Sequence, residues 1–358
     1  MRGCARKPPN ASILASREVA PDATRPKTHS RTTPIDRGPM RYGSGPGSPP
    51  DMRVADVHVG YSRYLGRQRK GTPMQRLNIC HVTEYLFSAP VSLEPHRLLL
   101  HPRESHNIRI ESSVLDIFPA HTVQWKRDVL DNSVAVVRFS ESTERLLIAS
   151  NVVIQHYDDN PFDFLIDDYA VNHPFAYLDV EQTDLAPFRQ SVYLADQVQV
   201  QSWLESLGFV RPIQTFTLLD QMNRAINRQF RYQMREEPGV QSPAFTLACQ
   251  SGSCRDFATL FMEACRHLGL ASRFVSGYLN TPLDDDSQGS THAWAEVYLP
   301  GAGWKGFDPT SGEVTGNKHI ASAVARHPEA VPPVSGSYLG PPNLSPILNV
   351  SVKVSALA

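Results

Sequence analysis

The sequence predicts an α+β protein in which an N-terminal antiparallel β-sandwich precedes a domain of mixed helices and strands. Three observations support this expectation. Runs of period-two alternation fill residues 77–155, apolar residues recur every three or four positions after residue 200, and a helix–strand–strand pattern occupies residues 254–308. The chain has 358 residues, enough for about two domains.

Residues 1–73 differ in composition from the rest of the chain. They hold 14 Lys and Arg against 5 Asp and Glu, are rich in Pro, Gly and Ser, and show neither helical nor strand periodicity. Such a segment cannot bury enough apolar surface to offset chain entropy, so we expect it to be disordered. Met74, just before the first regular pattern, is an alternative start. The segment has few aromatic residues, and we expect no binding to nucleic acid.

Charge, hydropathy and cysteine content describe an ordinary globular protein. The chain has 35 Lys and Arg against 36 Asp and Glu, a formal net charge of -1. No stretch approaches the roughly 18 apolar residues of a membrane span, and the apolar run at residues 11–14 is too short for a signal peptide. Five cysteines without a CxxC pair favour reduced thiols. We therefore expect a cytoplasmic protein without a membrane partner, and the sequence leaves its oligomeric state open.

The expected N-terminal β domain spans residues 74–157. Its first strand is predicted from Leu77 to Tyr85 and is interrupted by Ser88-Ala89-Pro90. Close turns separate the later strands, which indicates an antiparallel sandwich. Those strands are predicted at residues 107–118, 122–127, 133–139 and 145–155.

A Pro- and Asp-rich stretch, residues 158–190, predicts a linker to a second domain at residues 191–358. This domain is expected to begin with two helices. The first is marked by Trp203, Leu204 and Leu207, and the second by an apolar stripe at spacings of three and four. The stripe consists of Leu218, Leu219, Met222, Ile226 and Phe230.

A further helix is predicted to follow Ser253 and to end at Gly269, because apolar residues from Phe257 to Leu268 fall on one face. Cys254 therefore lies in its first turn. The unpaired N–H groups and the positive end of the helix dipole favour a thiolate there, and the thiolate is the nucleophilic form of cysteine.

Three strands are predicted after this helix, at Ser272–Leu279, His292–Leu299 and Trp304–Asp308. A polar loop, residues 280–290, joins the first two, and a turn centred near Gly301 joins the last two. This turn would place Asp308 opposite Trp294, close enough for its carboxylate to reach His292. A shift of one residue would place the two side chains on opposite faces, so the register stays open at this stage.

Cys254, His292 and Asp308 together have the chemistry needed for acyl transfer. The thiolate attacks a carbonyl, the imidazole holds the thiol proton and delivers it to the leaving amine, and the carboxylate fixes the tautomer and stabilises the imidazolium. The backbone N–H of Cys254 is a candidate donor to the oxyanion, and Gln250 is a candidate second donor.

Four ordered motifs resemble the bacterial branch of the transglutaminase-like superfamily. They are GSCRDFA at 252–258, LGLASRFVSGY at 268–278, THAWAEV at 291–297 and GWKGFDPT at 303–310. Upstream, CHVTEY at 80–85, PHR at 95–97 and LHPR at 100–103 are similar to the N-terminal β domain of that branch, and PPVSG at 332–336 extends the resemblance. It implies a papain-like catalytic core in which Cys254, His292 and Asp308 match the family's triad.

Members of this superfamily hydrolyse amide bonds or transfer a glutamine acyl group to an amine. Ser253 precedes the cysteine where animal transglutaminases have glutamine, and no calcium-loop pattern is present. We favour a cysteine protease or amidase that acts on peptides or proteins through a thioester, because water is always available and no amine-acceptor site is recognisable. The alternatives are a protein-glutamine γ-glutamyltransferase and a non-catalytic binding module on this scaffold.

Other polar residues are expected to be secondary. Arg255, Asp256 and Trp294 are near-site candidates, with Trp294 shielding the imidazole from water. Cys249 and Cys265 are expected to be structural. The acidic run at residues 284–286 lacks the Gly and distal Glu of an EF-hand, and no histidine spacing matches a zinc motif. We expect no metal and no cofactor.

Overall fold

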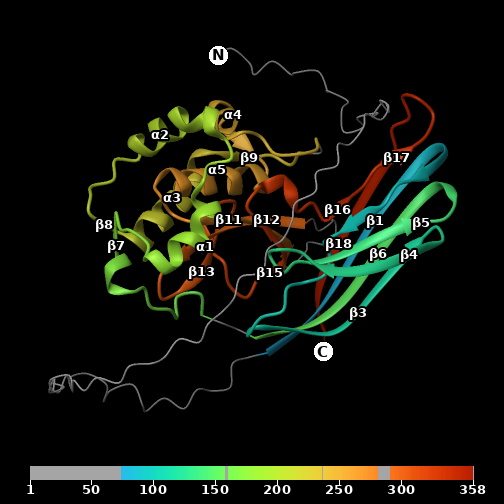
Figure 1. Cartoon of the computed structure of the whole chain (residues 1–358), viewed down its shortest axis with the longest axis horizontal. Coiled ribbons are helices and arrows are strands. Elements are labelled where there is room, and N and C mark those ends of the chain that lie inside the picture. The colour runs from blue at the N-terminus through green and yellow to red at the C-terminus, as the bar shows by residue number, and fades with distance from the viewer. Residues whose placement is uncertain (1–73, 158–159, 236, 281–290, 358) are drawn as a thin grey trace, which may run out of the picture. The chain divides into compact units, whose positions relative to one another are not determined.

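The computed structural model describes residues 74–157, 160–235, 237–280 and 291–357, which all belong to one compact unit. The described residues do not include the segment 1–73 that was expected to be disordered, which contains Cys4. They also exclude the acidic run 284–286. Most of the described strands belong to three sheets, labelled in Figure 1. None of the helices in these ranges is both long and apolar enough to cross a membrane.

Two antiparallel sheets form the expected β-sandwich. In the first, β1 (Met74–Leu93) pairs with β6 (Ser142–Tyr157), which pairs with β3 (Ile108–Phe118). The second has the order β16 (Val334–Ser335), β2 (His96–Leu98), β5 (Ser133–Phe139) and β4 (His121–Arg127). Apolar side chains of both sheets share one core, which includes Phe87, Leu146 and Ile148 from the first and Leu98, Ala135 and Val137 from the second.

The first strand is longer than the sequence predicts. β1 continues through Ser88-Ala89-Pro90 to Leu93, and its pairing with β6 shifts register between Leu86 and Val91. Proline has no N–H to donate to a ladder, so the pairing is interrupted there while the chain stays extended. The expected end of this strand at Ser88 is therefore wrong.

The C-terminal segment completes the β-sandwich instead of extending the second domain. β18 (Ile347–Leu357) pairs antiparallel with β1 along residues 76–86, and β17 (Tyr338–Leu339) pairs with the end of the same strand. Figure 1 shows β18, at the red end of the chain, beside the blue β1. This corrects the expected domain at residues 191–358. Because β1 and β18 are far apart in the sequence, their pairing leaves no pattern that a short stretch of sequence could show.

The second domain is a five-stranded antiparallel sheet packed against a central helix, α5 (Cys254–His267). The sheet order is β14 (Glu313–Val314), β13 (Gly303–Asp308), β12 (Thr291–Leu299), β11 (Ser272–Leu279) and β15 (His319–Ala325). Phe257, Phe261 and Ala264 of α5 share a core with Ala295 and Val297 of β12. Three helices pack around α5: α2 (Gln197–Ser206), α3 (Thr215–Gln229) and α4 (Pro243–Cys249).

The segment that was expected to be a linker also contributes to this domain. It forms η1 (Asp168–Ala170), β7 (Asn172–His173) and α1 (Asp179–Arg189). Leu185 of α1 packs with Tyr177 and Ala271, and Arg189 Nε donates to the carbonyl of Gly269 at 3.0 Å. The frequent proline and aspartate residues concealed these apolar anchors, so the expectation of a linker at residues 158–190 is corrected.

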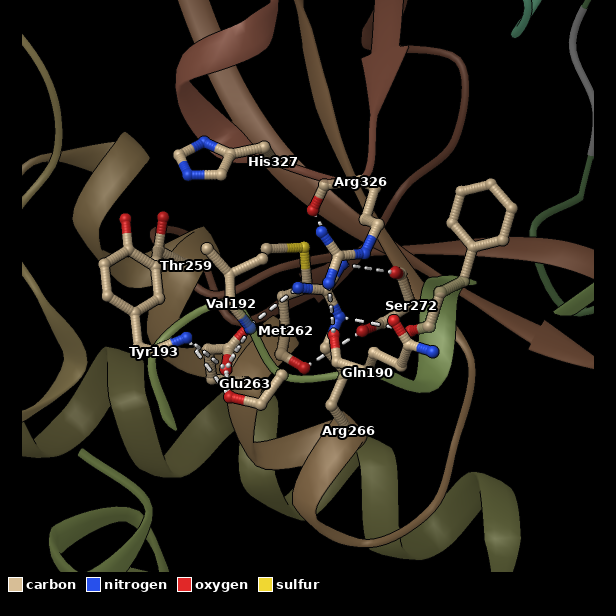
Figure 2. Close-up of polar contacts among 12 residues, drawn as sticks. Gln190, Val192, Tyr193, Thr259, Met262, Glu263, Arg266, Ser272, Arg326 and His327 are labelled. Atoms are coloured by element: carbon tan, nitrogen blue, oxygen red, sulfur yellow. Dashed lines mark hydrogen bonds and ion pairs between the residues drawn. The ribbon is translucent and has the colours of Figure 1, made fainter. Parts of the chain in front are cut away.

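A buried ion pair fastens α5 to its surroundings, as Figure 2 shows. Arg266 Nη1 contacts Glu263 Oε1 at 2.7 Å, and both side chains are fully buried. Glu263 also accepts hydrogen bonds from the Ser191 hydroxyl and the Val192 N–H. Arg266 donates to the carbonyls of Phe188, Ser272 and Arg326. One pair thus links α5 to α1 and the segment after it, to strand β11 and to the residue that follows β15.

Candidate active site

Cys254 is the first residue of α5, and a buried carboxylate holds this helix start in place. Asp256 Oδ2 accepts from the backbone N–H and the hydroxyl of Ser253, at 2.8 and 2.9 Å. Its Oδ1 accepts from Arg235 Nη1 at 2.8 Å and from the Gln241 N–H at 2.6 Å. Cys254 is 8% exposed, and its backbone N–H has no partner within the helix because it belongs to the first turn.

The hairpin register agrees with the prediction from the turn at Gly301. Ala295 pairs with Phe307, and the same register continued by one residue brings Asp308 opposite Trp294. His292 Nε2 and Asp308 Oδ2 are 2.9 Å apart. The alternative register, which would separate these side chains, is excluded.

Asp308 is fully buried and accepts hydrogen bonds on both carboxylate oxygens. Oδ1 accepts from the Thr310 N–H at 2.9 Å, whereas Oδ2 accepts from His292, from the Ser311 hydroxyl at 2.9 Å and from His319 Nε2 at 3.3 Å. Burial alone would raise the pKa of Asp308, but the hydrogen bonds and charges of the two histidines outweigh it and hold the pKa well below its usual range. Asp308 is therefore a carboxylate at neutral pH.

His292 lies between this carboxylate and Cys254. Burial lowers the pKa of His292, but hydrogen bonds to Asp308 and to the Cys254 side chain outweigh burial and raise the pKa to about 10. Nε2 is engaged by Asp308, so Nδ1 is the ring nitrogen left to share a proton with the sulfur. The arrangement therefore favours an imidazolium beside the cysteine.

Trp294 and Gly277 shape the environment of the imidazole. Trp294 is buried, and its ring centroid lies 6.2 Å from that of His292 in a stacked orientation and 5.2 Å from that of His319. Gly277 of β11 pairs with His292. A Cβ on Gly277 would lie 2.3 Å from the Ile320 carbonyl oxygen and 2.7 Å from Trp294 Cη2. Trp294 can thus cover His292 because Gly277, which pairs with His292, has no side chain.

Two of the other candidate residues lie away from His292. Arg255 donates from Nη2 to the carbonyls of Arg235 and Glu237, at 3.2 and 3.3 Å, so it holds the segment before α4. Gln250 is exposed and ends α4 in the left-handed conformation, with φ of 48°. Its backbone carbonyl accepts from the Arg231 N–H. The role of Gln250 as an oxyanion donor stays a prediction.

Sequence reasoning missed Tyr232. It belongs to β9 (Arg231–Tyr232), which pairs in parallel with β10 (Ser251–Gly252) just before Cys254. Its ring centroid lies 6.4 Å from that of Phe257 on α5. Burial and the neighbouring Cys254 raise the pKa of Tyr232 to about 12, so its hydroxyl remains a hydrogen-bond donor. The two-residue strands are too short to show periodicity, and no sequence signal marks this residue.

His319, the first residue of β15, was also missed. It is buried, and it reaches Asp308 because β15 pairs with β11 on the far side from β12. In the sequence it is one of 13 histidines, placed at the start of an apolar run. Only the strand order brings it to the site.

The same three side chains form a potential metal-binding group. His292, Asp308 and His319 each offer a ligand atom, and these atoms lie within 4.8 Å of one another. Two imidazoles and a carboxylate are ligands typical of zinc. In the structure, however, hydrogen bonds from both histidines to Asp308 account for their closeness.

The remaining described cysteines differ from Cys254. Cys265 is fully buried on α5, and burial raises the pKa of its thiol, which makes it a poor nucleophile. Cys80 and Cys249 are partly buried. Neither lies at a helix start, because Cys80 is in β1 and Cys249 ends α4.

Comparison with known proteins agrees with this fold. Residues 214–309 match the family model of the transglutaminase-like superfamily, and residues 77–155 match that of the bacterial transglutaminase-like N-terminal region. An uncharacterized protein of Mycobacterium tuberculosis, Rv2569c, is 26% identical over 294 residues, which cover 78% of this chain and 92% of the relative. An uncharacterized protein of Mycobacterium leprae, ML0607, is 33% identical over 111 residues, covering 30% of this chain and 38% of the relative.

Among solved structures, a protein described as a "putative cysteine protease" from Cytophaga hutchinsonii aligns with a TM-score of 0.64. It is 19% identical, and the alignment covers 80% of this chain and 92% of that chain. At this identity the likeness shows the fold alone. The chain therefore carries a transglutaminase-like superfamily core at residues 214–309 and the bacterial transglutaminase-like N-terminal region at residues 77–155.

Proposed function

We propose that this protein is a cysteine-dependent hydrolase of amide bonds in peptides or proteins, with Cys254, His292 and Asp308 as its catalytic triad. The observation that carries the proposal is the continuous chain of contacts at the site. Cys254 stands at a helix N-terminus close enough to raise the pKa of His292, and His292 Nε2 lies 2.9 Å from Asp308 Oδ2. These are a nucleophile, a proton carrier and an orienting carboxylate in the order that acyl transfer needs.

In the first half of the reaction, the Cys254 thiolate attacks the carbonyl carbon of the amide. A carbon–sulfur bond forms and the carbonyl π electrons move to oxygen. The intermediate then collapses, the carbon–nitrogen bond breaks, and the leaving amine takes the proton from His292 Nδ1. A thioester, a free amine and a neutral histidine remain.

In the second half, His292 acts as a base towards water. It takes one proton while the hydroxide oxygen bonds to the thioester carbon. Collapse of this intermediate breaks the carbon–sulfur bond, releases the acid and restores the thiolate–imidazolium pair. The Cys254 backbone N–H is the first donor proposed for the oxyanion, and the hydroxyl of Tyr232 joins Gln250 as a candidate for the second.

Hydrolysis and transamidation share the first half-reaction and differ in what attacks the thioester. The superfamily relationship supports thioester chemistry for this chain. Hydrolysis is the reaction we propose, because water needs no acceptor site.

A casein digest tests the proposal, because it offers many backbone and side-chain amides. Wild type should release new amines or ammonia at a steady rate, whereas Cys254→Ala should not. Cys249→Ala, which removes a cysteine outside the proposed triad, is the matched control and should keep the rate. Equal release by wild type and Cys254→Ala would contradict the proposal.

Addition of a fluorescent primary amine separates the two reactions. If the protein is a hydrolase, release of amines or ammonia should continue while little of the fluorescent amine is incorporated into the digest. Incorporation that outpaces release would identify the protein as a transamidase that uses the same triad.

A further inference from the structure

His319 donates a hydrogen bond to the buried carboxylate of Asp308. A backbone N–H fixes the tautomer of His319 that makes this donation possible. Its Nε2 lies 3.3 Å from Asp308 Oδ2, and the Gly316 N–H donates to its Nδ1 at 3.4 Å. Because Nδ1 accepts from an N–H, a neutral imidazole here carries its proton on Nε2. That proton points to Asp308, so the ring is a donor to Asp308 without needing a positive charge.

We propose that His319 is a positioning residue for the reaction, which holds the Asp308 carboxylate in the orientation that His292 requires. The proposal rests on the proposed function, because it assigns a role within the same triad. His319 does not touch the cysteine in this scheme, and it acts on catalysis only through Asp308 and His292.

Asp308 needs such support because it ends its strand. It is the last residue of β13 and is followed by a turn in which the Gly312 N–H donates to its carbonyl oxygen at 2.8 Å. Two of its carboxylate contacts, Thr310 N–H and Ser311 Oγ, come from this same turn. The contact from His319 comes from a separate strand, so it ties the carboxylate to the opposite edge of the sheet.

The strand that carries His319 is itself held along its length. His319 pairs with Leu279 of β11, and the Arg103 N–H donates to the Ala321 carbonyl at 2.7 Å. Near its end, the Asn132 side chain bonds Val324, and Arg266 Nη2 donates to the Arg326 carbonyl at 2.7 Å, as Figure 2 shows. β15 is therefore fixed to the β-sandwich and to α5, the helix that begins with Cys254.

Water is a poor substitute for this donor. The His319 side chain is 4% exposed and that of Asp308 is 1% exposed, and the Trp294 ring lies against His319 with centroids 5.2 Å apart. The ionisable groups next to His319 are Asp308 and His292, whose ring centroid is 6.1 Å away. Lys318, the neighbour in sequence, is exposed and paired with Glu313. Loss of the imidazole would leave a buried carboxylate oxygen short of one donor.

Two substitutions separate the donor role from simple packing. His319→Gln keeps an N–H donor at the end of a side chain of similar length, whereas His319→Phe keeps the ring and its volume but has no donor. The measurement is the titration of His292 by NMR on the full chain with labelled histidine, alongside the rate of Cys254-dependent release from the casein digest. Near-UV circular dichroism checks that each variant is folded.

We expect His319→Phe to lower the midpoint of the His292 titration by about one pH unit, because the Asp308 carboxylate is no longer held in the orientation that bonds His292. The release rate should fall about tenfold at saturating digest, without a change in the concentration that gives half of the maximal rate. His319→Gln should retain wild-type values for both quantities.

The outcomes also distinguish this proposal from the one it rests on. If wild type is active and His319→Phe keeps the wild-type titration and rate, the positioning role is wrong and the proposed function stands. The positioning role is also wrong if a folded His319→Gln loses as much of the release rate as His319→Phe. If wild type shows no release that depends on Cys254, the proposed function is wrong, whatever the titration of His292 shows.

Discussion

The side chain of Asn132 acts as a strand partner for Val324. Its Nδ2 donates to the Val324 carbonyl and its Oδ1 accepts from the Val324 N–H, both at 2.8 Å. Asn132 itself is fully buried and is held by Asp128 Oδ2 at 2.9 Å. An amide from the β-sandwich thus covers the edge of β15, so the β-sandwich supports the strand that carries His319.

Asn132→Ala should therefore destabilise the whole unit. It leaves a buried N–H and a buried carbonyl without partners, which predicts a loss of about 2 kcal/mol in the free energy of unfolding. Urea unfolding measures this loss. Asn349→Ala is the control, because Asn349 makes one exposed hydrogen bond to Glu84 and should change little. Equal effects of the two substitutions would show that the Val324 bonds do not hold the domains together.

Removal of the imidazole should change how alkylation of Cys254 depends on pH. The pKa of about 10 keeps His292 charged beside Cys254 at mildly acidic pH, where the imidazolium favours the reactive thiolate. In His292→Ala, iodoacetamide should therefore alkylate Cys254 more slowly at mildly acidic pH than in wild type. Mass spectrometry of each cysteine measures the rates, with Cys265 as the protected internal control. The same profile in both proteins would mean that the helix N-terminus alone activates Cys254.

The protonated His292 should also stabilise the fold in a defined pH window. Its pKa in the folded protein, about 10, lies above the ordinary value of 6.5, so the stabilisation is complete below pH 6.5 and is lost as pH rises through about 10. The melting temperature of wild type relative to His292→Gln should therefore decline across this window. Differential scanning fluorimetry at several pH values tests this, with His121→Gln in the β-sandwich as the control. A constant difference between wild type and His292→Gln would contradict the charged pair.

Asp256→Asn should impair both stability and reactivity. The substitution removes the negative charge that Arg235 contacts and alters the acceptor at the start of α5, so we expect a loss of about 3 kcal/mol in unfolding free energy. Cys254 alkylation should slow in the same variant, because Ser253 and the first helical turn lose their support. Asp220→Asn removes an exposed pair with Arg224 and should cost about 0.5 kcal/mol or less. Comparable losses in the two variants would rule out a special role for Asp256.

Gly277→Ala tests the close approach beside His292. A Cβ would meet the Ile320 carbonyl, a backbone atom that is paired within the sheet and cannot move aside. We expect a loss of about 3 kcal/mol from overpacking, together with slower Cys254 alkylation as Trp294 shifts. At Gly208 a Cβ meets nothing within 4 Å and φ is +68°, so Gly208→Ala should cost only about 1 kcal/mol of backbone strain. Calorimetry compares the two; a smaller effect at Gly277 would contradict the tight packing.

Local patterns were sufficient to predict the elements that carry Cys254, His292 and Asp308. The apolar face from Phe257 to Leu268 marked α5, and the turn at Gly301 favoured the β12–β13 register that brings His292 to Asp308, although only the structure excluded a shift of one residue. Both depend on interactions between residues near one another in sequence. The motifs around these residues then indicated the superfamily, which the comparisons showed independently.

Contacts between distant segments were not predictable in this way. The pairing of β18 with β1 and the packing of α1 on the catalytic core leave no periodic mark in the sequence. His319 and Tyr232 were missed for the same reason, since each reaches the site through the order of strands. What the sequence by itself determined was therefore the elements that carry Cys254, His292 and Asp308, and the fact that these side chains have the chemistry for acyl transfer. Only the tertiary structure decided which further side chains support them, because burial and strand order bring together residues whose separation along the chain hides their relationship.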